Sequence, residues 1–136
     1  ILRLFGAKIG SNVTIKPGVN IKYPWKLIVG NNCWIGENVW IDNLDIVTLA
    51  DNVCISQGVF LLCGNHNFKS SSFDLMLGPI TIESGAWLGA KSIVCPGVTV
   101  ASHAILSVAS LANKDLEPYT IYKGNPAVKF KDRIIE

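Results

Sequence analysis

The chain has 136 residues, enough for one domain, and its 49% hydrophobic and 16% charged residues are typical of a globular protein rather than a disordered one. A net charge of +2, with no block of like charge, gives no reason to expect a nucleic-acid partner. No apolar run reaches the roughly 18 residues of a membrane span, and no signal peptide is recognisable. The four cysteines lack the spacing of a zinc site or a disulfide framework. Together these features favour a cytoplasmic protein with reduced thiols.

From Ile9 onwards, apolar residues recur with a period of six, which excludes an amphipathic helix. The fifth position of each hexad is mostly small, and the fourth is often Gly or Asn, which tolerate left-handed backbone angles best. Each hexad is therefore predicted to form a short strand and a tight corner. Such strands cannot bury their inner faces alone, so they should stack into a parallel β-helix. The large residues that head the hexads are Ile9, Ile15, Ile21, Val29, Ile35, Ile41, Leu49, Ile55, Leu61, Ile82, Leu88, Val94, Val100 and Leu106, with Ala112 as the exception.

In the N-terminal half, three hexads and two further residues make a coil of 20 residues, as from Ile9 to Val29. Three hexads per coil predict a triangular prism. The further residues always follow the third hexad, so every insertion should leave from one edge of the prism. The small-residue rule fails on the same edge, where Trp25, Asp45 and Asn65 are expected to stack as a column. Local rules usually fail where a protein has a function.

The repeat stops near His66 and resumes at Ile82, which predicts an extruded loop of about residues 64–80. Gly64 occupies the fourth position of the last hexad before this loop, so we expect it to form a left-handed corner. His103, by contrast, occupies the fourth position of a regular hexad and is expected to be an ordinary surface residue.

Beyond Ile82 the coils shorten to three plain hexads and stay regular to Leu116. The pattern thus predicts about five coils over residues 9–117 and a tail over residues 118–136, in which a short strand and a helix are expected. All 136 residues belong to a single domain.

Tandem [LIV]-[GAED]-x-x-[STAV]-x units with an extruded loop and a histidine resemble the hexapeptide-repeat acyltransferases, which fold as left-handed parallel β-helices. The tail YKGNPAVKF is similar to the closing G-N-P-A signature of that family. Within the family, RLFGAKIG, YPWKL and NHNFKSSSFDL most resemble the colanic-acid and exopolysaccharide O-acetyltransferases. The resemblance implies acetyl transfer from acetyl-CoA to a sugar hydroxyl in polysaccharide biosynthesis, with no metal required. It also implies a homotrimer with active sites between chains, and outward Trp34, Trp40 and Phe60 favour association because they are costly to leave in water.

A hydroxyl is a poor nucleophile near neutral pH, so a base must take its proton, and histidine suits this role. In the resemblance, His66 aligns with the catalytic base of the family. Asp42 and Asn43 lie close to the positions at which family members contact the acceptor, whereas the repeat geometry favours Asp45, stacked on Asn65. All four are candidate substrate-binding residues.

Coenzyme A should lie along the plain coils, because its thin pantetheine arm can bond to the backbone of stacked corners. The residues that match the family's coenzyme A contacts are Ala90, Val108, Asn113 and Lys114. The phosphates of coenzyme A need cations, and the basic tail should bring Lys129 and Lys131 to the last coil.

Other functions remain open. Cys63 and His66 suggest a nucleophilic pair, although the family transfers acetyl directly and a buried thiol is ordinary in such a coil. The acceptor could instead be an amino sugar, an antibiotic or serine. A carbonic anhydrase of the same fold needs three zinc histidines, and this chain has two. A non-catalytic scaffold would need neither a base nor a polar column beside the loop.

Overall fold

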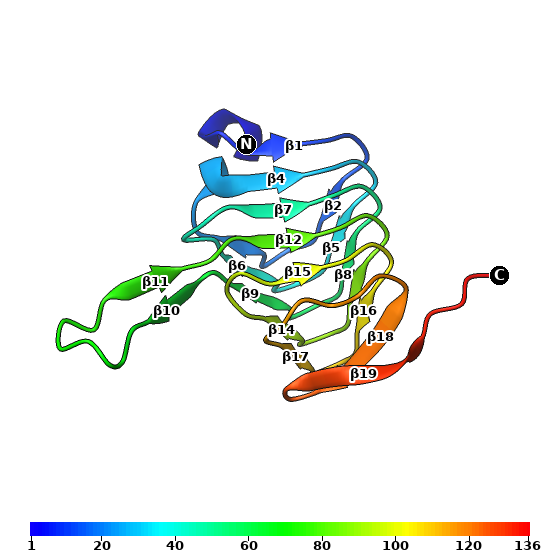
Figure 1. Cartoon of the computed structure of the whole chain (residues 1–136). Coiled ribbons are helices and arrows are strands. Elements are labelled where there is room, and N and C mark those ends of the chain that lie inside the picture. Colours follow the sequence, from blue (N-terminus) through cyan, green and yellow to red (C-terminus); the bar gives the residue numbers. More distant parts are fainter.

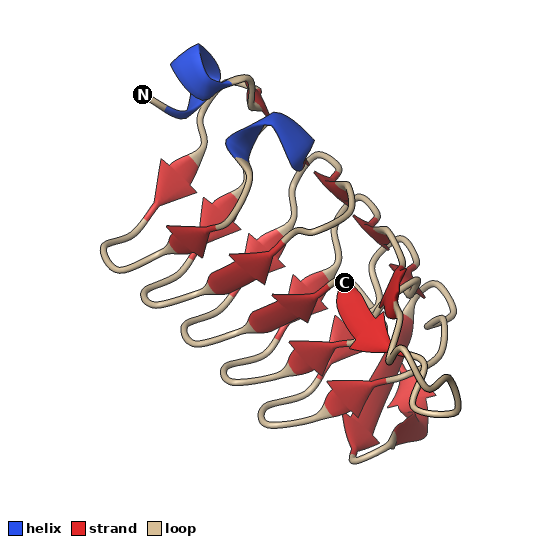
Figure 2. Cartoon of the chain, turned by 90° about the vertical axis from the view of Figure 1, so that its left-hand side faces the viewer, coloured by secondary structure: helices blue, strands red, loops and turns tan.

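Figure 1 shows the computed structural model of the chain, which describes all 136 residues. The strands form three parallel sheets, here called A, B and C, and each coil contributes one strand to each sheet in that order. Seen from the side in Figure 2, the coils form a regular staircase. The expected parallel β-helix of triangular coils is confirmed.

The three sheets are the faces of the prism. Sheet A consists of β1 (Lys8–Ile9), β4 (Leu27–Val29), β7 (Val47–Leu49), β12 (Ile80–Ile82) and β15 (Thr99–Val100). Sheet B consists of β2 (Thr14–Ile15), β5 (Trp34–Ile35), β8 (Cys54–Ile55), β13 (Trp87–Leu88), β16 (Ile105–Leu106), β18 (Thr120–Gly124) and, antiparallel at its edge, β19 (Ala127–Asp132). Sheet C consists of β3 (Asn20–Ile21), β6 (Trp40–Asp42), β9 (Phe60–Leu62), β14 (Ile93–Val94) and β17 (Leu111–Ala112).

The hexad heads fill the interior of the prism. In sheet B, for example, Ile35 is paired with Ile55 and Ile55 with Leu88, and all three side chains are fully buried. Parallel pairing places these side chains at the interstrand spacing of about 4.8 Å, so each aliphatic residue packs on the next. Burying a large aliphatic side chain contributes about 1.5–3 kcal/mol, which makes this column the main source of stability. The first coil is less buried because no other coil covers it.

The fourth position of the hexad forms the corners, as predicted. Its residues have positive φ at every corner between sheets A and B and between sheets B and C: Asn12, Asn32, Asn52, Gly85 and His103 at the first, and Gly18, Asn38, Gly58, Lys91 and Ala109 at the second. The edge between sheets C and A differs. There Pro24 lies in the 3₁₀ helix η2 (Pro24–Lys26), and only Gly97 has the left-handed angle.

The expectation for Gly64 was wrong. Gly64 begins the strand β10 (Gly64–His66), which pairs antiparallel with β11 (Leu75–Leu77), and it does not have a positive φ. The chain leaves the prism one residue earlier, at Cys63, whose N–H donates to the carbonyl of Asp42 and whose carbonyl accepts from the N–H of Gly78. The corner that Gly64 would have formed is therefore replaced by the base of a hairpin.

The first and last elements of the chain lie at the two ends of the prism. The 3₁₀ helix η1 (Leu2–Phe5) lies at the N-terminal end, and the β18–β19 hairpin lies at the other. The helix expected in the tail is not formed, because the alternating residues of AVKFKD suit a strand and the edge of β18 offers a partner. No helix in the structure is long and apolar enough to cross a lipid bilayer.

Candidate functional site

The hairpin β10–β11 is the largest departure from the prism. It leaves at the edge between sheets C and A, which is the edge opposite sheet B, and it projects away from the coils in Figure 1. Its three strand pairs are Gly64 with Leu77, Asn65 with Met76, and His66 with Leu75. The three apolar residues of β11 are exposed, so this arm presents a surface that a single chain leaves uncovered.

His66 lies on the outer part of this arm and is exposed. Its Nδ1 is 2.9 Å from the carbonyl oxygen of Phe73, and its ring stacks on the Phe73 ring with centroids 4.3 Å apart. A carbonyl oxygen can only accept, so Nδ1 must carry the proton and donate it. The neutral ring then has its lone pair on Nε2, which bonds to no other residue. This is the form of histidine that can take a proton from a bound hydroxyl.

The expected column of Trp25, Asp45 and Asn65 is not formed. Asn65 lies in the hairpin, where its Oδ1 accepts from the N–H of His66. Asp45 stays on the prism, and its Oδ1 accepts from the N–H of Ile46. Asn65 does not stack on Asp45 because the chain leaves the prism after Cys63, two residues before Asn65.

At this edge, Asn43 forms a buried contact between two coils. It is fully buried, its Oδ1 accepts from the N–H of Tyr23 at 2.9 Å, and its Nδ2 donates to the carbonyl of Tyr23 at 2.7 Å. These bonds join one coil to the next at the edge where the left-handed corner is missing. In the single chain, Asn43 therefore supports the edge from inside and is not presented to an acceptor.

Asp42 remains at the surface near the base of the hairpin. It ends β6, its side chain is partly covered, and its Oδ1 lies 3.7 Å from the Nζ of Lys22. Of the residues predicted to contact the acceptor, Asp42, Asp45 and Asn65 thus lie on the same edge as His66, with side chains that are not buried.

A groove lies on sheet B, at its corner with sheet C. Its volume is about 560 Å³, and it is lined by the outward side chains of Trp87, Ile105 and Ile121 and by the corners at Ala90 and Val108. Two residues predicted to contact coenzyme A therefore come together here. The groove combines an apolar floor with exposed backbone at its corners.

Glycine keeps this backbone accessible. A Cβ built on Gly89 would lie 2.7 Å from the backbone N of Val108 and 2.9 Å from the carbonyl oxygen of Leu106. No side chain fits there, so the two coils approach closely at the wall of the groove. The indole N–H of Trp87 donates to the hydroxyl of Ser56 at 2.9 Å, which fixes the ring on the floor.

The other predicted coenzyme A contacts are divided between two places. Asn113 and Lys114 follow β17, so they lie exposed on the edge between sheets C and A, below the hairpin and away from the groove. Lys131 pairs with Ile121 in the β18–β19 hairpin and so shares the outer face of the groove. Lys129 instead bonds to Glu117, and this hydrogen bond raises the pKa of Lys129.

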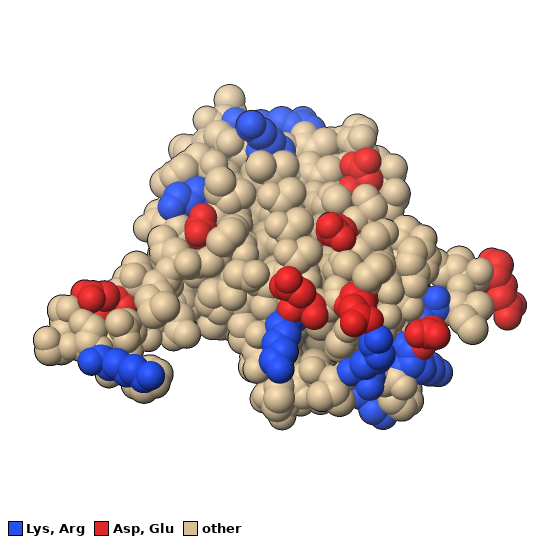
Figure 3. Space-filling model, viewed as in Figure 1, with Lys and Arg blue, Asp and Glu red and all other residues tan.

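Sequence reasoning missed three residues of these surfaces: Phe73, Trp87 and Lys123. Lys123 lies in β18 next to Tyr122, whose carbonyl accepts from the N–H of Ser107. The Nζ of Lys123 lies 3.7 Å from the centroid of the Phe130 ring. Figure 3 shows basic side chains gathered around this C-terminal end of the molecule. The signal for Lys123 was present in the sequence, since it directly precedes the G-N-P-A signature.

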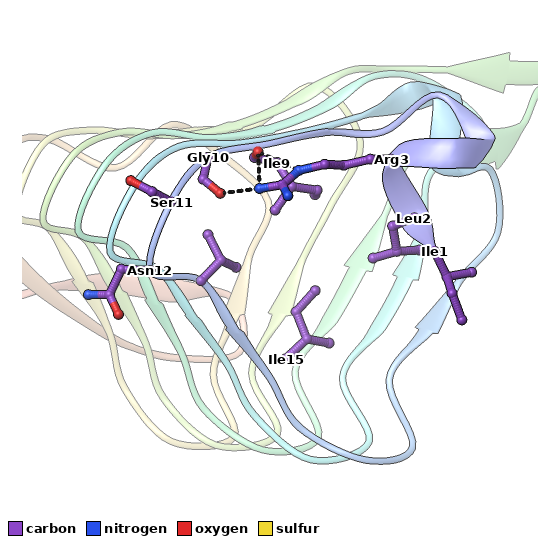
Figure 4. Close-up of a pocket in the computed structure, with 9 residues that line it drawn as sticks. Ile1, Leu2, Arg3, Ile9, Gly10, Ser11, Asn12 and Ile15 are labelled. Atoms are coloured by element: carbon purple, nitrogen blue, oxygen red, sulfur yellow. Dashed lines mark hydrogen bonds between the residues drawn. The ribbon is translucent and has the colours of Figure 1, made fainter.

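A second cavity opens at the N-terminal end of the prism. Figure 4 shows Ile1, Leu2 and Ile15 around it, and the guanidinium of Arg3 already donates to the carbonyls of Ile9 and Gly10. It is the uncovered end of the coil and holds no group suited to acid–base chemistry. No group of three His, Cys, Asp or Glu side chains is arranged to hold a metal ion.

Comparison with known proteins agrees with this architecture. The family model for the hexapeptide repeat of succinyl-transferase matches residues 26–63 and 79–107, on either side of the hairpin. A protein of Escherichia coli (strain K12) with the provisional name colanic acid biosynthesis acetyltransferase WcaF is 40% identical over 134 residues, which cover 98% of this chain and 74% of that protein.

Two solved structures carry the same fold. Galactoside acetyltransferase in complex with coenzyme A is 25% identical, with a TM-score of 0.89 over 96% of this chain and 67% of that chain. The hexapeptide-repeat acetyltransferase VCA0836 of Vibrio cholerae O1 biovar eltor, complexed with acetyl-CoA, is 21% identical, with a TM-score of 0.90 over 96% of this chain and 73% of that chain. Superpositions of this quality require coils of the same hand. The chain is therefore an acetyltransferase of the hexapeptide-repeat family.

Proposed function

We propose that this enzyme transfers the acetyl group of acetyl-CoA to a hydroxyl of a sugar in exopolysaccharide biosynthesis, with Nε2 of His66 as general base. The observation that carries the proposal is the bond between Nδ1 of His66 and the carbonyl of Phe73, because it leaves Nε2 with a free lone pair. The likeness to a colanic acid biosynthesis acetyltransferase over 98% of the chain supports a polysaccharide precursor as the acceptor.

The acetyl group passes directly from coenzyme A to the acceptor by addition to the thioester carbonyl followed by elimination of the thiolate. Nε2 takes the proton of the acceptor hydroxyl as its oxygen attacks the thioester carbonyl. The tetrahedral intermediate then expels coenzyme A as a thiolate, which takes the proton from the imidazolium and restores neutral His66. The proton of the acceptor hydroxyl thus ends on the thiol of coenzyme A, and the acetyl group passes to the acceptor without an acyl-enzyme.

The active site is proposed to lie between chains of a homotrimer. His66, Asp42 and Lys114 lie on the edge opposite sheet B, whereas Ala90 and Val108 line a groove on sheet B itself. The base and the groove of one chain therefore lie on different parts of the prism. Packing of the hairpin edge of one chain against sheet B of the next would join the two halves and cover the exposed β11 residues.

The cytoplasm is the proposed compartment. Acetyl-CoA is a cytoplasmic metabolite, and the four cysteines are unpaired, which suits a reducing environment.

The experiment is release of coenzyme A from acetyl-CoA with a panel of nucleotide sugars, oligosaccharides, amino sugars, serine and chloramphenicol. A sugar hydroxyl should be the best acceptor, identified by mass spectrometry and by the lability of the product ester to mild base. Turnover of an amine or an antibiotic alone would contradict a sugar ester as the product. The variant His66→Ala should lose about 100-fold to 10,000-fold in kcat, the usual contribution of a general base. Full turnover by this variant would refute the assignment of the base.

A further inference from the structure

Phe73 has an unusual backbone conformation. Its φ is +51°, in the left-handed region that an aromatic residue rarely occupies, and it lies at the tip of the hairpin rather than at a corner of the prism. Glycine would adopt this angle freely, but this position and its neighbours in the hairpin are not glycine. An outlier of this kind persists only when its surroundings impose it.

The surroundings of Phe73 do impose it. On one side, its N–H donates to the carbonyl of Ser70 at 3.0 Å. On the other side, the carboxylate of Asp74 accepts from both serine hydroxyls, from Ser72 at 2.7 Å and from Ser70 at 3.1 Å, and the two hydroxyls lie 2.8 Å apart. The carbonyl of Asp74 also accepts from the N–H of Asn67, which closes the tip.

The result of this conformation is the orientation of one carbonyl group. The left-handed angle turns the C=O of Phe73 back across the hairpin to within 2.9 Å of Nδ1 of His66, while the phenyl ring stacks on the imidazole with an interplanar angle of 14°. Oxygen and ring together fix both the tautomer and the plane of His66.

We propose that Ser70, Ser72 and Asp74 are positioning residues, which hold Phe73 left-handed so that its carbonyl keeps the proton of His66 on Nδ1. The inference rests on the proposed role of His66 as base. The three residues do not touch the reacting atoms and act only through Phe73.

The serine run supplies a matched pair of variants. Ser72 bonds to Asp74, whereas the side chain of Ser71 makes no hydrogen bond. Ser72→Ala and Asp74→Ala should lower kcat about 10-fold to 100-fold, the loss expected when a reacting group is misplaced, with little change in the KM for acetyl-CoA. Ser71→Ala should match the wild type.

The direct readout is the tautomer of His66, measured in the native protein by ¹⁵N NMR of the imidazole nitrogens, with His66→Ala to assign the signals. The wild type and Ser71→Ala should show the proton on Nδ1, and Ser72→Ala should show a mixture of tautomers. Phe73→Gly keeps the left-handed angle accessible and should retain more of the Nδ1–H form than Phe73→Val, which disfavours it.

Equal tautomer populations and equal kcat in Ser71→Ala and Ser72→Ala would overturn the proposal. Failure of the base assignment is distinguishable from this outcome. Full activity of His66→Ala would refute the role of His66 as base. The tautomer measurement would still report whether Ser70, Ser72 and Asp74 set the position of the proton on the His66 ring.

Discussion

The two histidines show how the surroundings of one residue decide its chemistry. Both rings stack on an aromatic ring, His66 on Phe73 and His103 on Tyr119. The hydroxyl of Ser102 donates to the carbonyl of Ser84 and therefore accepts from Nδ1 of His103, so both histidines carry their proton on Nδ1. What distinguishes His103 is its place at a corner between sheets A and B, away from the hairpin. The Cβ of any residue other than glycine at position 85 would also meet the His103 ring, which shows how tightly it packs at a structural corner. His103→Ala is therefore the matched control for His66→Ala, and it should retain turnover.

The Cys63 thiol is not suited to be a nucleophile. It is fully buried, and this burial raises its pKa to about 11. The thiolate, which is the reactive form, is therefore scarce at neutral pH. We expect iodoacetamide to leave Cys63 unmodified in the folded protein and to alkylate it after unfolding in guanidinium, as measured by peptide mass spectrometry. An acetylated Cys63 trapped after mixing with acetyl-CoA would restore the Cys–His alternative.

Asn43 should matter for stability. Asn43→Ala leaves the N–H of Tyr23 without its partner and its carbonyl with the N–H of Lys26 alone, at a cost of about 1–3 kcal/mol in the free energy of unfolding. The measurement is a urea titration compared with Asp45→Ala, whose side chain bonds only its neighbour and should change stability by less than about 0.5 kcal/mol. Equal stability of both variants would show that the edge does not depend on the Asn43 bridge.

At the scale of elements, the C-terminal hairpin links the fold to the donor site. Strand β18 extends sheet B by one step beyond β16 and contributes Ile121 to the groove, and β19 lies along it with Lys131 opposite Ile121. The cations of this hairpin differ in availability: Lys129 is held by Glu117, whereas Lys123 and Lys131 lie near the Phe130 ring with no carboxylate partner. The hairpin thus presents two free positive charges beside the groove.

This difference leads to a test with acetyl-CoA and its 3′-dephospho form. Lys131→Ala and Lys123→Ala should raise the KM for acetyl-CoA about 10-fold with nearly unchanged kcat, because the phosphates lie far from the reacting carbonyl. Lys129→Ala should have a smaller effect. The wild type should bind the dephospho donor more weakly than acetyl-CoA, and a variant that has lost the phosphate contact should not distinguish them. If the wild type and the three lysine variants all distinguish acetyl-CoA from its dephospho form equally, the 3′-phosphate binds at another surface, such as the one that contains Lys114.

At the scale of the whole molecule, the prism separates the two halves of the proposed site. In a triangle, the edge between sheets C and A is the one opposite sheet B, so the His66 hairpin and the Ala90 groove lie on different parts of the prism. The outward Trp34, Trp40 and Trp87 are each more than 40% exposed in the single chain, and they lie on sheets B and C. Both features favour a trimer in which every site uses two chains.

Complementation between inactive variants tests this arrangement. His66→Ala lacks the base, and Ala90→Glu should block the groove and repel the phosphates. Each should be inactive alone, but subunits refolded together should recover up to about one quarter of the wild-type activity, since random mixing pairs an intact hairpin with an intact groove at that frequency. Sedimentation velocity checks that the mixture is trimeric. No recovery in mixed trimers would mean that both halves belong to one chain.

The sequence by itself determined the repeating part of this protein. Heads such as Ile35 and Leu88 point inward, and corners such as Asn32 and Gly58 are left-handed, because both properties depend only on the six residues of a unit. The repeat also located the one interrupted edge and the histidine beside it.

Only the tertiary structure decided how that edge is built. The hairpin begins at Gly64, directly after Cys63, because pairing of β10 with β11 replaces the corner that Gly64 would otherwise form. The same departure moved Asn65 off the prism and left Asn43 to bridge the coils from inside. These outcomes depend on hydrogen bonds between residues distant in the chain, and a pattern with a period of six carries no information about them.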